Sequence, residues 1–224
     1  MDKKYELTDS MDYNGVKLFR IRALRDIKGM VKAGDLGGWV ESEANLSHEG
    51  DCWIFEEAKV YGKAEILHNA RVCNRSEVMG NANVEDCAVV GWEAKVYGSA
   101  TLKGHSVVCG CAEVFGGAVL LDEVKVCGTA KVSGTAVLNS FATISGDAIV
   151  NSSDDYHCFR NTWSSRRWFT YTKSNKKWLV GCFYGTGDEL IARAYSESKP
   201  KGKCYEAAVK YVAAIEAVKE EYGV

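Results

Sequence analysis

The sequence predicts a mainly β protein built around a parallel β-helix of six-residue repeats. Every sixth residue from Ile54 to Val150 is aliphatic, without an insertion in the whole run. Two residues before each of these positions stands a small residue, from Cys52 to Ala148, which is Ala, Ser or Cys everywhere except at Val124. Such a unit is a short strand and a corner, in which the aliphatic side chain points inward and the small one fits where the corner leaves little room.

Three units make one triangular coil of 18 residues, so residues 18 apart should stack as parallel strands about 4.8 Å apart. One column of this kind keeps valine, and the corner that follows it keeps glycine. A glycine column indicates a backbone with positive φ or a close approach of successive coils. The two columns are Val60, Val78, Val96, Val114, Val132, Val150 and Gly62, Gly80, Gly98, Gly116, Gly134.

An outward ladder of large apolar residues runs beside the glycine corner. It consists of Tyr61, Met79, Tyr97 and Phe115. An exposed apolar stripe of this length indicates a subunit interface. Ordinary stacking that stabilises one face of the coil is the alternative.

The chain divides into three expected regions. Residues 1–51 form an N-terminal β cap, 52–152 the β-helix, and 153–224 a C-terminal α+β module. In the cap, Val16 to Arg22 alternates like a strand and Gly34 to Val40 reads as a turn entering the first coil. Ala44-Asn45-Leu46 is one further repeat unit, out of register by two residues.

The C-terminal region loses the six-residue period. Strand-like runs occur at 156–159, 167–172 and 177–184. Thr186 to Glu189 forms a capping box that opens a helix to about Ser198. Pro200 and Gly202 should break the chain before a second helix from about Lys203 to Glu221. Its expected apolar face is Ala207, Ala208, Tyr211, Val212, Ile215 and Val218, which completes a ββαα module.

The run Glu57-Ala58-Lys59-Val60-Tyr61-Gly62 resembles the hexapeptide-repeat left-handed β-helix superfamily. The resemblance covers nearly half of the chain and implies a left-handed coil and a homotrimer. Many members of that superfamily are acyl- or nucleotidyltransferases that use a histidine base at a subunit interface. The chain order also resembles bacteriophage and prophage proteins, often labelled as transferases or polymer-forming. The shared pieces are Phe19–Leu24, Lys32–Trp39, Ala44–Ser47, the Ala-x-Val run and Gly181–Thr186.

Composition limits the partners, the cellular location and the cofactors that we expect. The formal net charge of −2 indicates no nucleic-acid partner. No apolar run is long enough for a transmembrane helix, and the N-terminus does not resemble a signal peptide, so we expect a cytoplasmic protein, in the host cytoplasm if phage-encoded. The nine cysteines form no CxxC pair, which favours reduced thiols and no metal site. We expect no cofactor.

Hydroxyls, cations and aromatic rings gather in the C-terminal module. The candidate ligand-binding residues are Ser164, Ser165, Arg166, Arg167, Tyr171, Lys173, Trp178, Thr186 and Gly187. Guanidinium groups and a helix N-terminus favour phosphate or carboxylate, and the rings could stack on a base. This pattern predicts a small anionic or nucleotide ligand. The alternative is a solvated hairpin over a small aromatic core, with Thr186 acting only as a cap.

Four further residues are candidates for catalysis. Cys182 could be a nucleophile with His157 as its base, although a buried core thiol is the preferred interpretation. A transferase would use His68 or His105, although no loop leaves the coils and a solvated corner is the preferred role for His68. The leading hypothesis is therefore a non-enzymatic, phage-encoded trimeric protein that sequesters a ligand or inhibits a host factor. A transferase that uses acyl-CoA or a nucleotide sugar and a purely structural virion or scaffold component are the alternatives.

Overall fold

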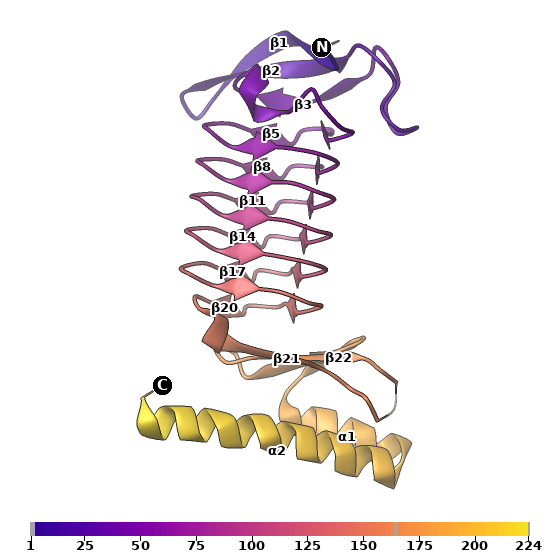
Figure 1. Cartoon of the computed structure of the whole chain (residues 1–224), viewed down its shortest axis with the longest axis vertical. Coiled ribbons are helices and arrows are strands. Elements are labelled where there is room, and N and C mark those ends of the chain that lie inside the picture. The colour runs from indigo at the N-terminus through magenta and orange to yellow at the C-terminus, as the bar shows by residue number, and fades with distance from the viewer. Residues whose placement is uncertain (1–2, 164, 224) are drawn as a thin grey trace. The chain divides into compact units, whose positions relative to one another are not determined.

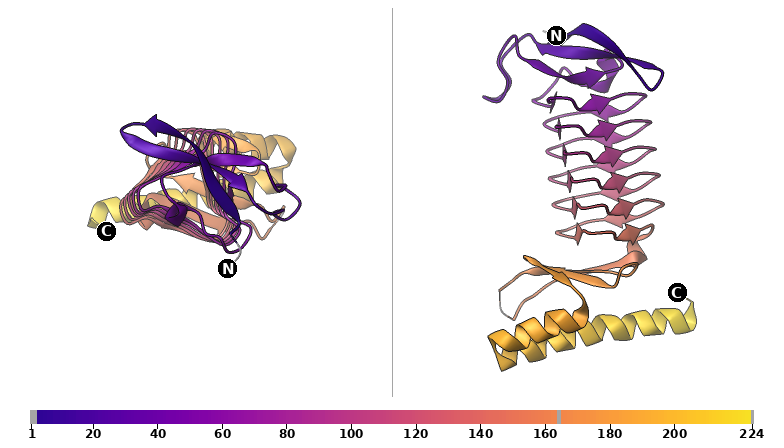
Figure 2. Two further views of the ribbon diagram at one scale, coloured as in Figure 1. Left: turned by 90° about the horizontal axis from the view of Figure 1, so that it is seen from above. Right: turned by 180° about the vertical axis from the view of Figure 1, so that it is seen from behind.

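The computed structural model describes residues 3–163 and 165–223, which fall into two compact units, Met1–Ser153 and Asp154–Val224. The first unit is a parallel β-solenoid of about six coils with a β extension at its N-terminal end (Figure 1). Figure 2 shows the same stack of coils from behind. Residues 18 apart pair in parallel, as in Val60 with Val78. The predicted parallel β-helix is confirmed, and its left-handed sense stays a prediction.

Each coil contributes one two-residue strand to each of three sheets. The first sheet contains β5 (Lys59–Val60), β8 (Glu77–Val78), β11 (Lys95–Val96), β14 (Glu113–Val114), β17 (Lys131–Val132) and β20 (Ile149–Val150). The second contains β4 (Trp53–Ile54), β7 (Arg71–Val72), β10 (Val89–Val90), β13 (Val107–Val108), β16 (Lys125–Val126) and β19 (Thr143–Ile144). The third contains β6 (Glu65–Ile66), β9 (Asn83–Val84), β12 (Thr101–Leu102), β15 (Val119–Leu120) and β18 (Val137–Leu138).

The interior of the solenoid is filled as the six-residue period predicts. Every aliphatic position from Ile54 to Val150 and every small position from Cys52 to Ala148 has 0% exposure. The corners turn on residues in the left-handed region of φ, which is the geometry predicted for the glycine column. Gly62 has a φ of +71°, and a Cβ on it would lie 3.1 Å from backbone atoms of Gly80. Both explanations of that column, positive φ and close approach, therefore hold.

The N-terminal extension continues the first sheet. Strand β2 (Val16–Ala23) pairs antiparallel with both β1 (Tyr5–Tyr13) and β3 (Leu36–Val40), and β3 pairs in parallel with β5. The segment read as a turn into the first coil is thus itself a strand. A 3-10 helix, η1 (Glu43–Asn45), follows, and Leu46 bridges Ile66. This separation of 20 residues instead of 18 confirms the offset of two.

The second unit begins with the 3-10 segment η2 (Ser153–Asp155), which spans the division between the units. Its antiparallel sheet contains β21 (Tyr156–Arg160), β22 (Trp168–Thr172), β23 (Lys177–Val180) and β24 (Phe183–Gly185). Helices α1 (Gly187–Glu197) and α2 (Lys199–Tyr222) follow. The core between sheet and helices contains Phe169, Trp178, Val180, Leu190, Ala194, Tyr205, Ala208 and Val212.

Three expectations about this unit need correction. The sheet has four strands, more than the three predicted runs and the two strands of the expected ββαα module, because Gly181, with a φ of +61°, folds the run 177–184 into a hairpin. Pro200 and Gly202 do not break the chain. Proline is compatible with the first turn of α2, where no N–H partner is lost, and Gly202 is buried against the ring of Tyr195.

The buried face of α2 was predicted only in part, since Ala208 and Val212 are buried whereas Ala207 is exposed. It contains Tyr205, Ala208, Val212 and the carboxylate of Glu216, whereas Tyr211 and Val218 are exposed. Hydrophobicity alone could not identify this stripe because one of its members is charged. The capping box of Thr186 and Glu189 is confirmed at the start of α1. Among the described residues, no helix is both long and apolar enough to cross a membrane.

Candidate functional site

The predicted ligand set of the C-terminal unit does not converge on one place. Ser164 lies outside the described residues. Ser165 and Arg166 are exposed in the loop between β21 and β22. Arg167 lines one pocket, while Tyr171, Trp178, Thr186 and Gly187 line another, and the two pockets share no residue.

The pocket at Arg167 is basic. It has a volume of about 160 Å³, and its polar rim holds Arg167, Arg193, Lys201 and Glu197. Three cations thus face one carboxylate, which Lys201 already binds in an ion pair. That hydrogen bond, and then the charges of Arg193 and Arg167, hold the pKa of Glu197 below its usual value. The pocket therefore keeps an excess of positive charge that suits an anion.

Packing fixes the basic side chains at the rim. A Cβ on Gly181 would lie 3.2 Å from Cδ of Arg167, so the absence of a side chain there lets Arg167 lie against the hairpin turn. The guanidinium carbon of Arg193 lies 5.9 Å from the ring centroid of Phe183, which lines the same pocket. Such cation–π contacts orient a guanidinium group without neutralising it.

Cys182 also lines the basic pocket, and it is exposed, which overturns its interpretation as a buried core thiol. The base considered for it lies elsewhere. His157 Nε2 is 2.7 Å from Oε1 of Glu216, whose other oxygen lies 3.0 Å from Nζ of Lys173. His157 and Lys173 are therefore both engaged by the buried carboxylate of α2.

The second pocket has a volume of about 260 Å³ and contains the rings of Tyr171 and Trp178 beside the N-terminus of α1. The hydroxyl of Thr186 accepts a hydrogen bond from the backbone N–H of Glu189, and the Glu189 carboxylate accepts one from the backbone N–H of Thr186. This end of the helix already holds the carboxylates of Asp188 and Glu189. Its geometry therefore fits the capping alternative better than an anion site.

The two histidines of the transferase hypothesis occupy exposed positions on the solenoid. His68 sits at a corner with a φ of +56°, and its Nδ1 accepts a hydrogen bond from the backbone N–H of Asp86. His105 immediately follows Gly104, which is the residue at the same corner two coils further on. The strands recur every six residues through both coils, with no inserted loop. The two imidazoles therefore stand in different columns of the solenoid.

The predicted outward ladder is a continuous stack within one chain. The rings of Tyr97 and Phe115 are parallel, with centroids 4.8 Å apart, and the Tyr61 hydroxyl lies 2.9 Å from Sδ of Met79. All four side chains are half-buried. Burial, together with the hydrogen bond to Glu113, raises the pKa of Tyr97 to about 12. Stacking inside the chain accounts for part of this ladder, and its role as an interface stays a prediction.

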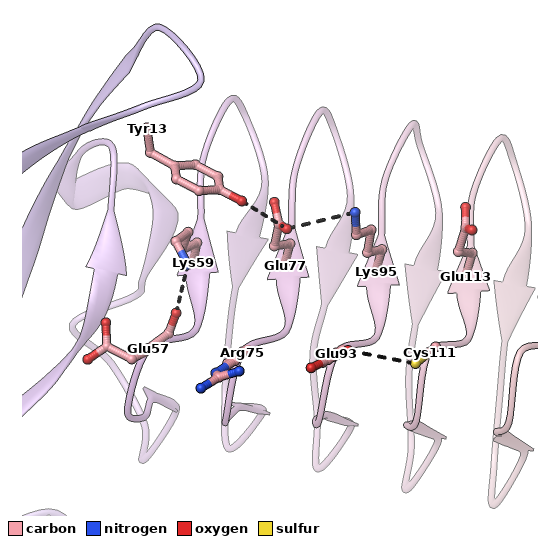
Figure 3. A pocket seen from close by; sticks show the side chains of 9 residues that line it. All are labelled: Tyr13, Glu57, Lys59, Arg75, Glu77, Glu93, Lys95, Cys111 and Glu113. Carbon is pink, nitrogen blue, oxygen red and sulfur yellow. Dashed lines mark hydrogen bonds and ion pairs between the residues drawn. The ribbon is translucent and has the colours of Figure 1, made fainter.

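A charged groove, which sequence reasoning missed, lies beside this ladder (Figure 3). Its volume is about 620 Å³, and acidic and basic side chains alternate from coil to coil along two columns, the second of which ends in a thiol. One column is Lys59, Glu77, Lys95 and Glu113, and the other is Glu57, Arg75, Glu93 and Cys111. Reading the outward positions at a spacing of 18 would have found both columns.

Comparisons with known proteins give a partial match. No profile of a known protein family matches the chain. The chain is 34% identical over 84 residues to an Escherichia coli (strain K12) protein described as the uncharacterized acetyltransferase YdcK. The match covers 33% of this chain and 26% of that protein, so the chain aligns with about a quarter of its relative. A hexapeptide-repeat β-helix fits both this likeness and the observed solenoid.

Proposed function

We propose that this protein is a non-enzymatic binding protein whose C-terminal unit captures a small anion in the basic pocket. The observation that carries the proposal is the excess of cations around that pocket, where Arg167, Arg193 and Lys201 face only Glu197. For Arg167 and Arg193 no ion pair is found among residues 3–163 and 165–223. Both guanidinium groups are thus available for bidentate contacts with phosphate or carboxylate.

The size of the pocket limits the ligand. Sites for whole drug-sized ligands occupy about 300–1,000 Å³, whereas this pocket offers about 160 Å³. It therefore suits one phosphate or carboxylate group, with the rest of the ligand outside. A nucleotide remains a suitable ligand if its phosphate enters. If the gene comes from a phage or another mobile element, the ligand would be a host signalling nucleotide that the protein sequesters.

Calorimetry with the intact chain tests this proposal. The probes are inorganic phosphate, AMP, ADP-ribose and a cyclic dinucleotide, each at low and high salt. We expect Arg193→Ala and Arg167→Ala to weaken binding about tenfold or more, because each removes a charge-assisted contact worth about 1.5–3 kcal/mol. Arg166→Ala is the matched control, since Arg166 is exposed next to Arg167 and does not line the pocket. Absence of binding for every probe, or an equal loss in Arg166→Ala, would contradict it.

We further propose a homotrimer, supported by the apolar ladder from Tyr61 to Phe115. An exposed or half-exposed apolar stripe on a regular face is a surface that association can bury. In such an assembly the solenoid would be a rigid spacer that presents several C-terminal units together. Linking several anion sites raises their joint affinity for a multivalent ligand without any new contact.

A transferase is the second candidate function, and the specific observation that favours it is the likeness to a protein described as an acetyltransferase. It predicts turnover of acetyl-CoA with an amine or hydroxyl acceptor, and loss of that turnover in His68→Ala or His105→Ala. No product with an acceptor panel, or full turnover in both variants, would exclude a histidine-dependent transferase. A purely structural role would instead leave every small-molecule probe unbound.

A further inference from the structure

Trp92 occupies a solenoid corner that its backbone does not favour. It has a φ of +58°, and the next residues in the same corner column are Gly110, Gly128 and Gly146, with φ of +72°, +73° and +67°. Bulky residues rarely adopt this region because the side chain crowds the backbone. The Trp92 side chain is 63% exposed. It therefore neither fills the core nor suits its corner, and strain of this kind is a reason to look for a role outside the fold.

Trp92 lines an open pocket of about 330 Å³. Its other walls are polar and include Asn74, Arg75 and Glu93. Within the described ranges, Arg75 forms no ion pair, and the carboxylate of Glu93 accepts only the thiol of Cys111, at 3.8 Å. One guanidinium without an ion pair and one carboxylate with only a long contact to a thiol thus lie on neighbouring coils and line the same pocket as Trp92.

This pocket continues into the charged groove, because Glu57, Arg75 and Glu93 line both. Figure 3 shows the guanidinium of Arg75 next to the carboxylate of Glu93 along the lower row of side chains. The groove carries four carboxylates and three cations, so its net charge is close to zero. Opposite charges also pair inside it, as Lys95 does with Glu77 at 3.9 Å. The electrostatic field of the groove therefore adds little to the binding free energy of a charged ligand.

We propose that Trp92, Arg75 and Glu93 form a binding site for a neutral, extended saccharide. Each sugar hydroxyl both donates and accepts hydrogen bonds, so it can be matched by a carboxylate on one coil and a guanidinium on the next. The apolar C–H face of a pyranose ring packs on an indole, which is the aromatic side chain with the largest contact area. Coils repeat about every 4.8 Å, close to the length of one hexose unit, so successive sugars meet successive coils.

The test measures binding of cellohexaose, chitohexaose and maltohexaose to the intact chain by calorimetry, with indole fluorescence as a second readout. We expect one of these probes to bind with little dependence on salt, and Trp92→Gly and Arg75→Met each to weaken it about tenfold or more. Glycine suits the backbone at position 92, because glycine occupies the three following places of the column. Ser140→Gly is the matched control, since Ser140 has a φ of +61° at a different corner.

Several results would overturn the proposal. Failure of all three neutral probes at millimolar concentration is one, and unchanged binding in Trp92→Gly is another. Binding of acidic polysaccharides alone, with steep salt dependence, would show that charge and not the indole selects the ligand. If Trp92→Gly lowers the mass of the protein in light scattering and no saccharide binds, the occupant is a second copy of the chain. None of these results depends on the basic pocket of the C-terminal unit.

Discussion

Trp92 and Gly110 occupy the same corner position on successive coils, with φ of +58° and +72°. We expect substitutions at these two positions to have different effects on the free energy of unfolding. A Cβ on Gly110 would lie 2.9 Å from the backbone oxygen of Gly128, so Gly110→Ala must both strain φ and push two coils apart. We expect it to lower the free energy of unfolding by about 2 kcal/mol or more, measured by urea denaturation.

Trp92→Gly should leave stability within about 1 kcal/mol of the natural chain. Relief of the left-handed strain contributes about 1–2 kcal/mol. Losing the buried third of the indole, roughly 70 Å², costs about 2 kcal/mol at 25 cal/mol per Å². The two effects nearly cancel. A large loss of stability on urea denaturation would show that the indole holds the solenoid together and has no need of a ligand.

Ser76 and Ser106 occupy the small inward position on different coils, and both have 0% exposure. Ser76 Oγ donates to the carbonyl of Cys73 at 2.7 Å, whereas Ser106 Oγ has no hydrogen-bond partner among the described residues. A buried polar group without a partner costs about 1–3 kcal/mol. We therefore expect Ser106→Ala to stabilise the protein by about 1 kcal/mol and Ser76→Ala to destabilise it slightly. Equal effects in thermal unfolding would show that a water satisfies Ser106.

The solenoid interior could be predicted because one steric constraint, the narrow tube inside the coils, determines the residue type at every inward position. Val78, Val96 and Val114 must fill the same narrow tube on every coil, so their residue type repeats at the spacing of the coil. At the start of the Trp92 corner column the constraint on residue type is weaker, since a positive φ recurs there without a recurring residue. Glu56, Asn74 and Trp92 therefore vary along one column, and no period marks the indole as special.

The basic pocket could be predicted only in part. Arg167 was found because it lies in a cluster of cations and hydroxyls, but Arg193 and Lys201 join it from two helices. Which face of each helix turns toward the hairpin depends on packing around Tyr205 and not on local sequence. The spacing of four residues in Arg193, Glu197 and Lys201 is the signal that would have linked them.

Measuring the oligomeric state tests whether the apolar ladder is a subunit interface. Phe115→Lys places a charge at the end of the ladder, where Phe115 stacks on Tyr97, and should convert a trimer to a monomer in light scattering, because an unpaired charge in an apolar interface is costly. Thr101→Lys is the matched control, since Thr101 is a half-buried outward residue of β12 on a different sheet. A monomeric natural chain, or equal dissociation in the control, would leave the ladder with its stacking role alone.

The pH dependence of the C-terminal unit should follow Glu216. Burial by itself raises the pKa of this carboxyl, but hydrogen bonds from His157 and Lys173 bring the pKa below its ordinary value. A lowered folded-state pKa stabilises the protein above the unfolded value of about 4.3. That stabilisation is lost as the pH falls through the folded pKa. The hydrogen bond between Lys173 and Glu216 also raises the pKa of Lys173. Lys173 therefore stabilises the folded protein below about pH 10.4, and this stabilisation is lost as the pH rises through the folded-state pKa.

Glu216→Gln should therefore lower the free energy of unfolding at pH 7 by about 2 kcal/mol, because it removes charge-assisted hydrogen bonds from a buried position. The loss should begin to shrink as the pH falls below about 4.3, where the unfolded carboxyl takes up a proton, and should disappear once the pH is below the lowered pKa of the folded carboxyl. Glu206→Gln is the matched control, since Glu206 pairs with Lys210 and accepts a hydrogen bond from Tyr195 at the surface of α2, where solvent screens the charges and the contribution to stability is small. Urea denaturation of both variants across this pH range checks the prediction. A constant difference between Glu216→Gln and the natural chain at every pH would mean that packing of this side chain, and not its charge, stabilises α2.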